Sequence, residues 1–392
     1  MKKKGDIISN SFSKKYLVIC APYLNNIGGT EIEAVNTAVN LYDSLLYQKI
    51  ILFSPKSANK TLFQNIIGDR KVNFLTYPTF FSSSFVDLIN RIFFKFGCRY
   101  KISEGIYWKF MNNKISTFFI LTYPKCSYFF PILKTAATAN KIIGKITMGQ
   151  FDILPHNHLN FYKRFDSIIV FNDEQKDFWL SNYQFNQVLA MDIMIPNEIK
   201  LLLVSPIKPA DNNNLVFGFL GRISSEKNIM DMIRLLDFLN NKNKLQCKLI
   251  IQGEGDAEYI NKIISKIKDL NLTEFVIFNN WFIDPMLTHQ FFDKIEVFLV
   301  TSIHEGGPIT ALEASAAGRI VLGYDIGVMS DRFGKFPYLV NKNFEELCDS
   351  TLEVISMDFR KRNDLALKIK DYYCSRLSNQ QKSKALIAVF DK

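Results

Sequence analysis

The chain has 392 residues, more than one hydrophobic core usually serves, so two domains are expected. Hydrophobic residues make up 48% and charged residues 22%, which excludes a disordered chain. The formal net charge of +10 favours an anionic partner such as a membrane surface, a nucleic acid or a phosphorylated substrate.

Strand and helix patterns alternate along the chain, which predicts an α/β fold with parallel sheets. In the first half, strands are expected at 16–20, 49–53 and 167–171, and helices at 31–47 and 172–180. In the second half, strands are expected at 215–220, 248–252, 275–278 and 297–300, and helices at 228–239, up to 270 and from 344 onward. A polar connection at 196–214 predicts the interdomain linker.

The sequence gives no sign of a membrane span. The nearest apolar run, 118–133, is interrupted by Pro124, Lys125 and Pro131. The cysteines are scattered without metal-binding spacing, which is typical of reduced thiols in a cytosolic protein.

The segment 302–313 follows the strand 297–300 and predicts a glycine turn and a helix that opens at Pro308. Glu305 lies in the turn, and Glu313 lies eight residues further on, in the helix. Glycines allow close approach to the backbone, and a helix N-terminus attracts anions. The pattern suits a sugar linked to a nucleotide diphosphate, although an ordinary turn with surface glutamates is the alternative.

A second motif places Gly221, Arg222 and Lys227 between the strand 215–220 and the next helix. Two cations five residues apart would lie over the C-terminal edge of the sheet, where ligands bind in open α/β folds. The Arg fork and the Lys point charge both suit phosphate oxygens. A helix-capping loop with solvated charges is the alternative.

The two motifs resemble the E-x7-E and G-R-x-x-x-x-K elements of the retaining family-four (group 1) glycosyltransferases. That family has the GT-B architecture, with two Rossmann-like domains facing a cleft. The resemblance implies an acceptor-binding domain at 1–205, a nucleotide-sugar-binding domain at 206–377, and a last helix at 378–392 that packs back on the first domain.

The resemblance also assigns roles to the residues of the two motifs. Arg222 and Lys227 would hold the donor diphosphate, Glu313 the ribose, and Glu305 the sugar hydroxyls. The remaining donor pocket would comprise Gly221, His304, Gly306, Gly307, Pro308 and Ile309.

Three further turns resemble family elements. Gly253 and Glu254 match a G-x-G turn beside the nucleotide, although a plain turn would look the same. Trp281 and Phe282 lie where the family packs the base; glycine usually replaces Trp281, so a buried aromatic anchor is expected there, with stacking on the base as the alternative. Gly28 and Gly29 resemble the G-G-x-E turn that faces the reaction centre, and a tight strand-to-helix turn is the alternative.

The family often places a first-domain histidine near the donor sugar. Asp152, His156 or His158 could serve here, and the register of the segment leaves the choice open. A solvated loop histidine is the alternative.

No metal and no other cofactor are expected. The sequence contains no Asp-x-Asp pair, the element through which another glycosyltransferase architecture holds its metal-bound diphosphate. Arg222, Lys227 and helix amides would stabilise the leaving group instead. The resemblance implies a front-face reaction in which a diphosphate oxygen accepts the proton of the acceptor.

The segment 91–114 interleaves six basic residues with seven aromatic ones. This composition suits an anionic membrane interface. Stacking on single-stranded nucleic acid and a helix with one core face are the alternatives. No recognised nucleic-acid module accompanies the segment, so no nucleic-acid partner is expected.

The resemblance implies a transferase that moves a sugar from a UDP-hexose or UDP-N-acetylhexosamine to a glycan or lipid-linked glycan acceptor. The setting would be O-antigen, capsule or lipopolysaccharide assembly, in the cytoplasm and peripheral to the inner face of the plasma membrane. A nucleotide-sugar epimerase of the same architecture and a non-catalytic glycan- or membrane-binding scaffold are the rival interpretations.

Overall fold

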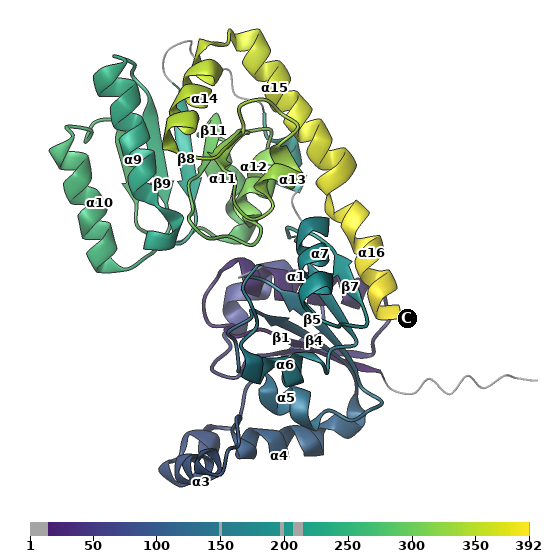
Figure 1. Ribbon diagram of the computed structural model, residues 1–392. Coiled ribbons are helices and arrows are strands. Elements are labelled where there is room, and N and C mark those ends of the chain that lie inside the picture. The colour runs from purple at the N-terminus through teal and green to yellow at the C-terminus, as the bar shows by residue number, and fades with distance from the viewer. Residues whose placement is uncertain (1–14, 149–150, 197–199, 207–214, 392) are drawn as a thin grey trace, which may run out of the picture.

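A computed structural model of the chain describes residues 15–148, 151–196, 200–206 and 215–391. It contains two parallel sheets, each flanked by helices, in two lobes that follow each other along the chain (Figure 1). The predicted α/β fold with two Rossmann-like domains is therefore confirmed.

The first sheet has seven parallel strands in the order β3-β2-β1-β4-β5-β6-β7. Its strands are β1 (Tyr16–Cys20), β2 (Lys49–Phe53), β3 (Val72–Leu75), β4 (Ile115–Thr122), β5 (Lys141–Ile146), β6 (Ser167–Val170) and β7 (Val188–Ala190). Its helices are α1 (Gly29–Asp43), α2 (Gln64–Ile67), α3 (Ser84–Lys95), α4 (Ile102–Met111), α5 (Phe130–Thr135), α6 (His156–Tyr162) and α7 (Asp173–Asn182).

The second sheet has six parallel strands in the order β10-β9-β8-β11-β12-β13. Its strands are β8 (Val216–Leu220), β9 (Lys248–Gln252), β10 (Val276–Asn279), β11 (Val297–Val300), β12 (Ile320–Tyr324) and β13 (Val340–Asn341). Its helices are α9 (Ile229–Asp237), α10 (Ala257–Asp269), α11 (His289–Phe292), α12 (Ile309–Ala316), α13 (Met329–Phe333), α14 (Phe344–Ser356) and α15 (Phe359–Tyr372).

Burial on both faces explains the sequences of the central strands. In β1, Leu17 and Ile19 join the core on one face of the sheet, and Val18 and Cys20 join the core on the other. A parallel strand covered on both sides therefore appears as a continuous apolar run, not as an alternating one. The strands predicted at 16–20, 49–53, 248–252 and 297–300 are confirmed at those bounds.

Two expectations from the sequence need revision. The helix predicted at 31–47 ends at Asp43, and Leu45 adopts a positive φ of 60° that breaks the helix. The predicted polar linker contains a short helix, α8 (Lys200–Val204), because Leu202 is buried in the core of the second domain. Residues 197–199 and 207–214 of the linker lie outside the described residues.

The last helices run from the second domain back along the first (Figure 1). A π-helical turn, η7 (Tyr373–Leu377), joins α15 to α16 (Asn379–Asp391). Leu386 and Phe390 of α16 enter the core of the first domain. The Phe390 ring meets Phe119 edge-on at 5.3 Å, and Lys141 Nζ donates to the Val389 carbonyl at 2.6 Å.

Candidate active site

Lys227 and Glu305 meet at the C-terminal edge of the second sheet. Their loops follow β8 and β11, which are neighbours in that sheet, and the Lys227 ammonium donates to Glu305 Oε1. Ser302 Oγ donates to the same oxygen at 3.0 Å. The two predicted motifs, about eighty residues apart in the sequence, therefore form one charged cluster.

Backbone hydrogen bonds hold the same two loops together. The Ile303 amide donates to the Glu226 carbonyl at 2.8 Å. Thr301 Oγ1 donates to the carbonyls of Lys227 and Asn228 at 3.2 and 3.0 Å. The loops that carry Lys227 and Glu305 are thus held together by the protein itself.

Arg222 lies at the exposed rim of this cluster and pairs with Glu226. It also acts on the first domain, because its charge lowers the pKa of Glu31 in α1. Burial is the larger effect and raises the pKa of Glu31 to about 7. Arg222 therefore lies near enough to the N-terminal end of α1 for its charge to act on Glu31.

The Gly28–Gly29 turn begins α1 in the first domain. A Cβ at Gly28 would lie 2.6 Å from Glu31 Oε2, which shows that the Glu31 carboxylate folds back over the start of the helix. A Cβ at Gly29 would meet nothing within 4 Å. The backbone at Gly29 is therefore open to a ligand, whereas Gly28 makes room for the side chain of its own helix.

Glu313 lies in α12, which begins at Ile309 with Pro308 as its N-cap, one residue later than the sequence predicted. Its side chain is only 3% exposed, and burial raises its pKa to about 8. Tyr373 of η7 is close enough for Glu313 to raise the tyrosine's pKa, which burial already raises strongly. Glu313 is therefore a buried carboxylate that favours its protonated form at neutral pH.

The G-x-G turn supports the loop that carries Arg222. A Cβ at Gly253 would lie 1.8 Å from the Gly221 carbonyl oxygen, and one at Gly255 would lie 1.9 Å from the Ile223 carbonyl oxygen. The Ile223 amide donates to the Glu254 carbonyl at 2.8 Å. Both glycines are thus required by close packing of two backbones.

The expectation that Trp281 is a buried anchor is wrong. Its side chain is 52% exposed, in the loop that follows β10, the edge strand of the second sheet. The neighbouring Phe282 is 40% exposed, and its amide donates to Glu254 Oε1 at 3.3 Å. His304 is exposed beside Glu305, while Pro308 and Ile309 are buried.

Two of the three first-domain residues proposed to lie near the donor sugar make contacts within their own domain. Asp152 is exposed and lies 3.8 Å from Lys125 Nζ. His158 Nδ1 hydrogen-bonds the Pro124 carbonyl at 2.9 Å, and its ring packs on Phe130. His156 is exposed at the start of α6. Of the two histidines, only His156 has a ring free of this packing against the first domain.

The loop that carries Glu305 touches the first domain through residues that sequence reasoning missed. A Cβ at Gly306 would lie 2.4 Å from the Thr147 carbonyl oxygen, and one at Gly307 would lie 3.0 Å from the Phe171 ring. Lys145 Nζ lies 4.3 Å over that same ring. The two glycines thus let the backbones of the two domains approach closely.

A buried ion network also crosses the domain boundary. Asp192, just after β7, accepts from Arg332 of α13 and, at 3.0 Å, from Lys382 of α16. Arg332 Nη1 donates to the Pro308 carbonyl at 2.7 Å. The network therefore joins the first domain, the last helix and the start of α12, and no local sequence signal points to it.

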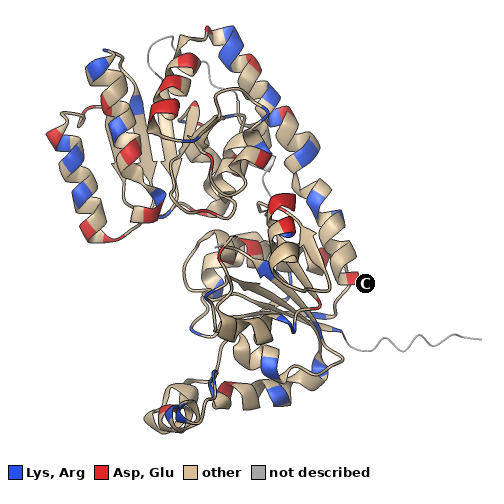
Figure 2. Ribbon diagram, viewed as in Figure 1, with Lys and Arg blue, Asp and Glu red and all other residues tan. Residues whose placement is uncertain are grey.

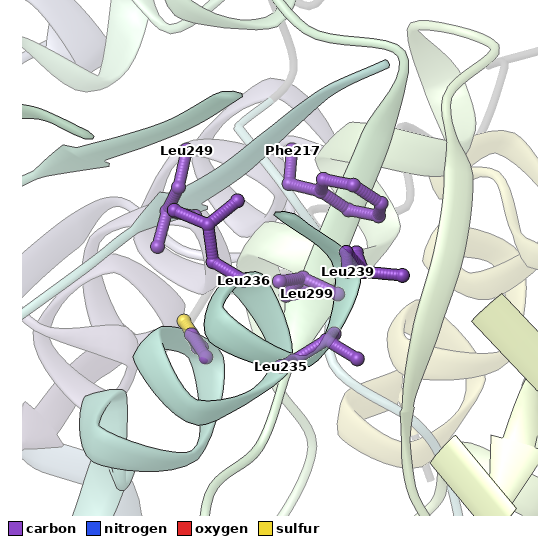
Figure 3. Close-up of a pocket in the computed structure, with 7 residues that line it drawn as sticks. Phe217, Leu235, Leu236, Leu239, Leu249 and Leu299 are labelled. Carbon is purple, nitrogen blue, oxygen red and sulfur yellow. The ribbon is translucent and has the colours of Figure 1, made fainter. Parts of the chain in front are cut away.

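A further feature lies away from this charged cluster. An apolar pocket in the second domain is part of the packing between α9 and the sheet (Figure 3) and is lined by Phe217, Met232, Leu235, Leu236, Leu239, Leu249 and Leu299.

Within the described ranges, no three His, Cys, Asp or Glu side chains gather as a metal site requires. Independence from metal remains a prediction.

Solved structures with the same fold cover nearly the whole chain. HepE of Anabaena, solved with UDP and glucose, has 15% identity and a TM-score of 0.73 over 96% of this chain and 99% of its own. A mutant of S. aureus TarM, solved with Fondaparinux, α-GlcNAc-glycerol and UDP, has 13% identity and a TM-score of 0.70 over 96% and 100%. A Rickettsia africae glycosyltransferase has 13% identity and a TM-score of 0.70 over 97% and 98%. The fold is therefore GT-B.

A protein-family model matches the second domain. Residues 204–370 match the model for glycosyl transferases group 1. Over these residues, which form most of the second domain, the chain is similar to the group 1 glycosyltransferases. No curated protein sequence matches the chain significantly.

Proposed function

We propose that the chain is a retaining glycosyltransferase that moves a sugar from a nucleotide sugar to a glycan or lipid-linked glycan. The observation that carries the proposal is the contact between Lys227 and Glu305, from separate loops of a group 1 domain. An ammonium suits the donor diphosphate, and a carboxylate suits the hydroxyls of the sugar. Arg222 adds a second cation on the side that faces the first domain.

In the proposed reaction, the bond between the anomeric carbon and the diphosphate oxygen breaks. The acceptor hydroxyl forms the new bond on the same face of the sugar, and the departing diphosphate oxygen takes the hydroxyl proton. Lys227 and Arg222 stabilise the negative charge that develops on the diphosphate. Because these cations are fixed in the protein, we expect transfer to continue after chelation of divalent metal.

The donor we propose is a UDP-hexose or UDP-N-acetylhexosamine. HepE was solved with UDP and glucose, and the TarM mutant with UDP and α-GlcNAc-glycerol, which supports a uridine nucleotide. Glu313 would accept hydrogen bonds from the ribose. The exposed Trp281 ring would stack on the base, a role that burial would have prevented.

We further propose that the first domain binds an anionic membrane surface through α3 and α4, in surface-polysaccharide assembly at the inner face of the plasma membrane. The two helices lie at the end of the first domain away from the second (Figure 1). Within α3, Asn90 is the one buried residue, so the helix leaves most of its apolar side chains uncovered.

The exposed apolar side chains of this surface extend from just before α3 to the end of α4: Phe80, Phe85, Leu88, Ile92, Phe93, Phe94, Phe96, Ile106 and Phe110. Residues 84–114 also include six basic residues, all exposed, and only two acidic ones. Figure 2 shows basic positions along both helices. Apolar side chains flanked by cations suit the interface of an anionic bilayer. No described helix combines the length and apolar character that a membrane span requires.

A thermal-shift screen with UDP, GDP, ADP and their sugars, followed by a nucleotide-release assay, tests the proposed chemistry. A uridine nucleotide should raise the melting temperature because it binds the folded state alone. UDP should then be released from its sugar, faster with an acceptor extract. Interconversion of UDP-sugars without release would identify an epimerase, and binding without either reaction would identify a scaffold.

A further inference from the structure

The loops that follow three neighbouring strands of the first sheet carry two tyrosines and a lysine. Tyr23 follows β1, Lys56 follows β2, and Tyr128 follows β4. Because β2, β1 and β4 are adjacent and parallel, these residues gather at one edge of the sheet. The loop that carries Tyr23 is the same loop that ends at the Gly28–Gly29 turn.

The side chains of these residues form one cluster. Lys56 Nζ donates to the Tyr23 hydroxyl at 3.2 Å and lies 4.7 Å from the Tyr23 ring centre and 5.1 Å from that of Tyr128. The two tyrosine hydroxyls are 3.2 Å apart. The Lys56 side chain is exposed, so the ammonium is accessible to a ligand from solvent.

The backbone beneath the cluster is rigid. The Leu24 amide donates to the Ser57 carbonyl at 3.2 Å, and the Asn59 amide donates to the Leu24 carbonyl at 2.7 Å. Ser54 Oγ donates to the Pro22 carbonyl at 3.3 Å. The loops after β1 and β2 therefore continue the pairing of their strands, and Tyr23 and Lys56 keep their relative positions without a ligand.

The electrostatics of the cluster favour an anion. The hydrogen bonds from Tyr128 and Lys56 lower the pKa of Tyr23, and those to Tyr128 and Tyr23 raise the pKa of Lys56. Lys56 therefore remains a cation over the whole physiological range. A phosphate group can accept from the ammonium and from the tyrosine hydroxyl that does not donate to the other.

We propose that Tyr23, Lys56 and Tyr128 bind a phosphate group of the acceptor, and that the acceptor is a phosphorylated saccharide whose ring packs against the tyrosines. This inference rests on the proposed glycosyltransferase function and names the class of acceptor. The phosphorylated saccharide could be a soluble sugar phosphate or a sugar linked through phosphate to a lipid.

The test uses the full-length protein with its donor site filled by saturating UDP, so that a phosphate probe cannot bind there. Glucose 6-phosphate should then raise the melting temperature further, and glucose should not. In Lys56→Met, the affinity for glucose 6-phosphate should fall about tenfold, the loss expected for one charge-assisted hydrogen bond. Lys60→Met, which removes another exposed lysine of the same domain, should behave as wild type.

A second arm addresses the lipid-linked source. Neutral vesicles with and without a prenyl-phosphate-linked glucose are sedimented with wild type, Lys56→Met and Tyr128→Phe. Binding that requires the phosphate-linked lipid and weakens in both variants would support the proposal with a lipid-linked acceptor, even if glucose 6-phosphate has no effect.

Wild-type responses in Lys56→Met in both arms, or no response of wild type to either phosphorylated probe, would overturn the proposal. Failure of the donor site gives a different result, because UDP alone would then leave the melting temperature of wild type unchanged. A lower melting temperature of Lys56→Met with unchanged probe affinity would show that the cluster only stabilises the fold.

Discussion

Asp192 accepts two hydrogen bonds from Arg332, at 3.0 Å from Nε and 2.5 Å from Nη2, although the two residues belong to different domains. Burial by itself would raise the pKa of Asp192, but Arg332 and Lys382 hold it well below its ordinary value. Arg332 also binds the Pro308 carbonyl at the start of α12. Through Arg332, the Asp192 carboxylate thus links the two domains and the start of the helix that carries Glu313.

Asp192→Asn should destabilise the protein by about 3–5 kcal/mol, because it leaves two buried cations without a carboxylate. The free energy of unfolding in urea measures this loss. Asp43→Asn is the matched control, since Asp43 binds Arg70 through the same two-bond geometry at an exposed site. There the cost should stay below about 1 kcal/mol. Equal losses in the two variants would contradict the importance of the buried network.

Lys227→Met and Glu305→Gln should each reduce UDP-sugar turnover by at least about a hundredfold, the usual cost of one preorganised group that stabilises transition-state charge. Both variants should remain folded, because the Lys227 carbonyl and the Ile303 amide keep the loops joined. Lys262→Met removes an exposed ion pair of the same domain and should keep full activity. Wild-type turnover in either site variant would show that the reaction occurs elsewhere.

Glu313 should make stability depend on pH. Its folded pKa of about 8 lies above the ordinary value, so its favourable contribution is complete below about pH 4 and is lost as pH rises through 8. Between pH 5 and pH 9, wild type should lose about 4 kcal/mol relative to Glu313→Gln. Urea unfolding at several pH values measures the difference, with the exposed Glu258→Gln as control. Parallel curves for wild type and Glu313→Gln would contradict the buried, protonated state.

UDP affinity tests the ribose contact of Glu313 separately. Ribose hydroxyls donate hydrogen bonds, which favour the ionised carboxylate. UDP should therefore bind wild type more tightly at pH 8.5 than at pH 6.5, and Glu313→Gln should lose this trend. The dissociation constant at the two pH values, measured by calorimetry, decides the question.

The surface on α3 and α4 should govern membrane binding. The double variant Phe96→Ser and Phe110→Ser removes two of its most exposed rings, at 84% and 81%. The binding constant for vesicles containing anionic lipid, measured by flotation, should fall by at least about a hundredfold, because each side chain that the bilayer buries contributes about 1.5–3 kcal/mol. Leu45→Ser, an equally exposed position of the first domain, should float like wild type. Equal flotation of both variants and wild type, or none at all, would contradict the proposed surface.

The sequence predicted those parts of the fold that are encoded locally. The apolar runs at β1, β2, β9 and β11 are short, buried on both faces and bounded by polar residues, so their type and limits were readable. The strands β3, β4, β5, β7, β12 and β13 were not predicted. In β5, Lys145 interrupts the apolar pattern. That lysine is buried and lies 3.7 Å from Glu33, a partner in α1 that no local pattern reveals.

The same distinction holds at the candidate site. The two motifs around Lys227 and Glu305 could be located because each combines glycine, charge and the end of a strand within a few residues. Asp192 and Arg332 lie 140 residues apart and carry no motif, so only the folded chain brings them together. Trp281 was misjudged because its loop follows an edge strand, and the position of a strand within its sheet is not readable from the local sequence.

The path of α16 has a consequence for synthesis on the ribosome. Phe390 covers Phe119 and Tyr47, yet the entire second domain is translated between them. The nascent first domain must therefore keep part of its sheet uncovered while its neighbour is being made. Closure of its core becomes one of the last events of folding, and until then this part of the nascent chain is a natural site for a chaperone.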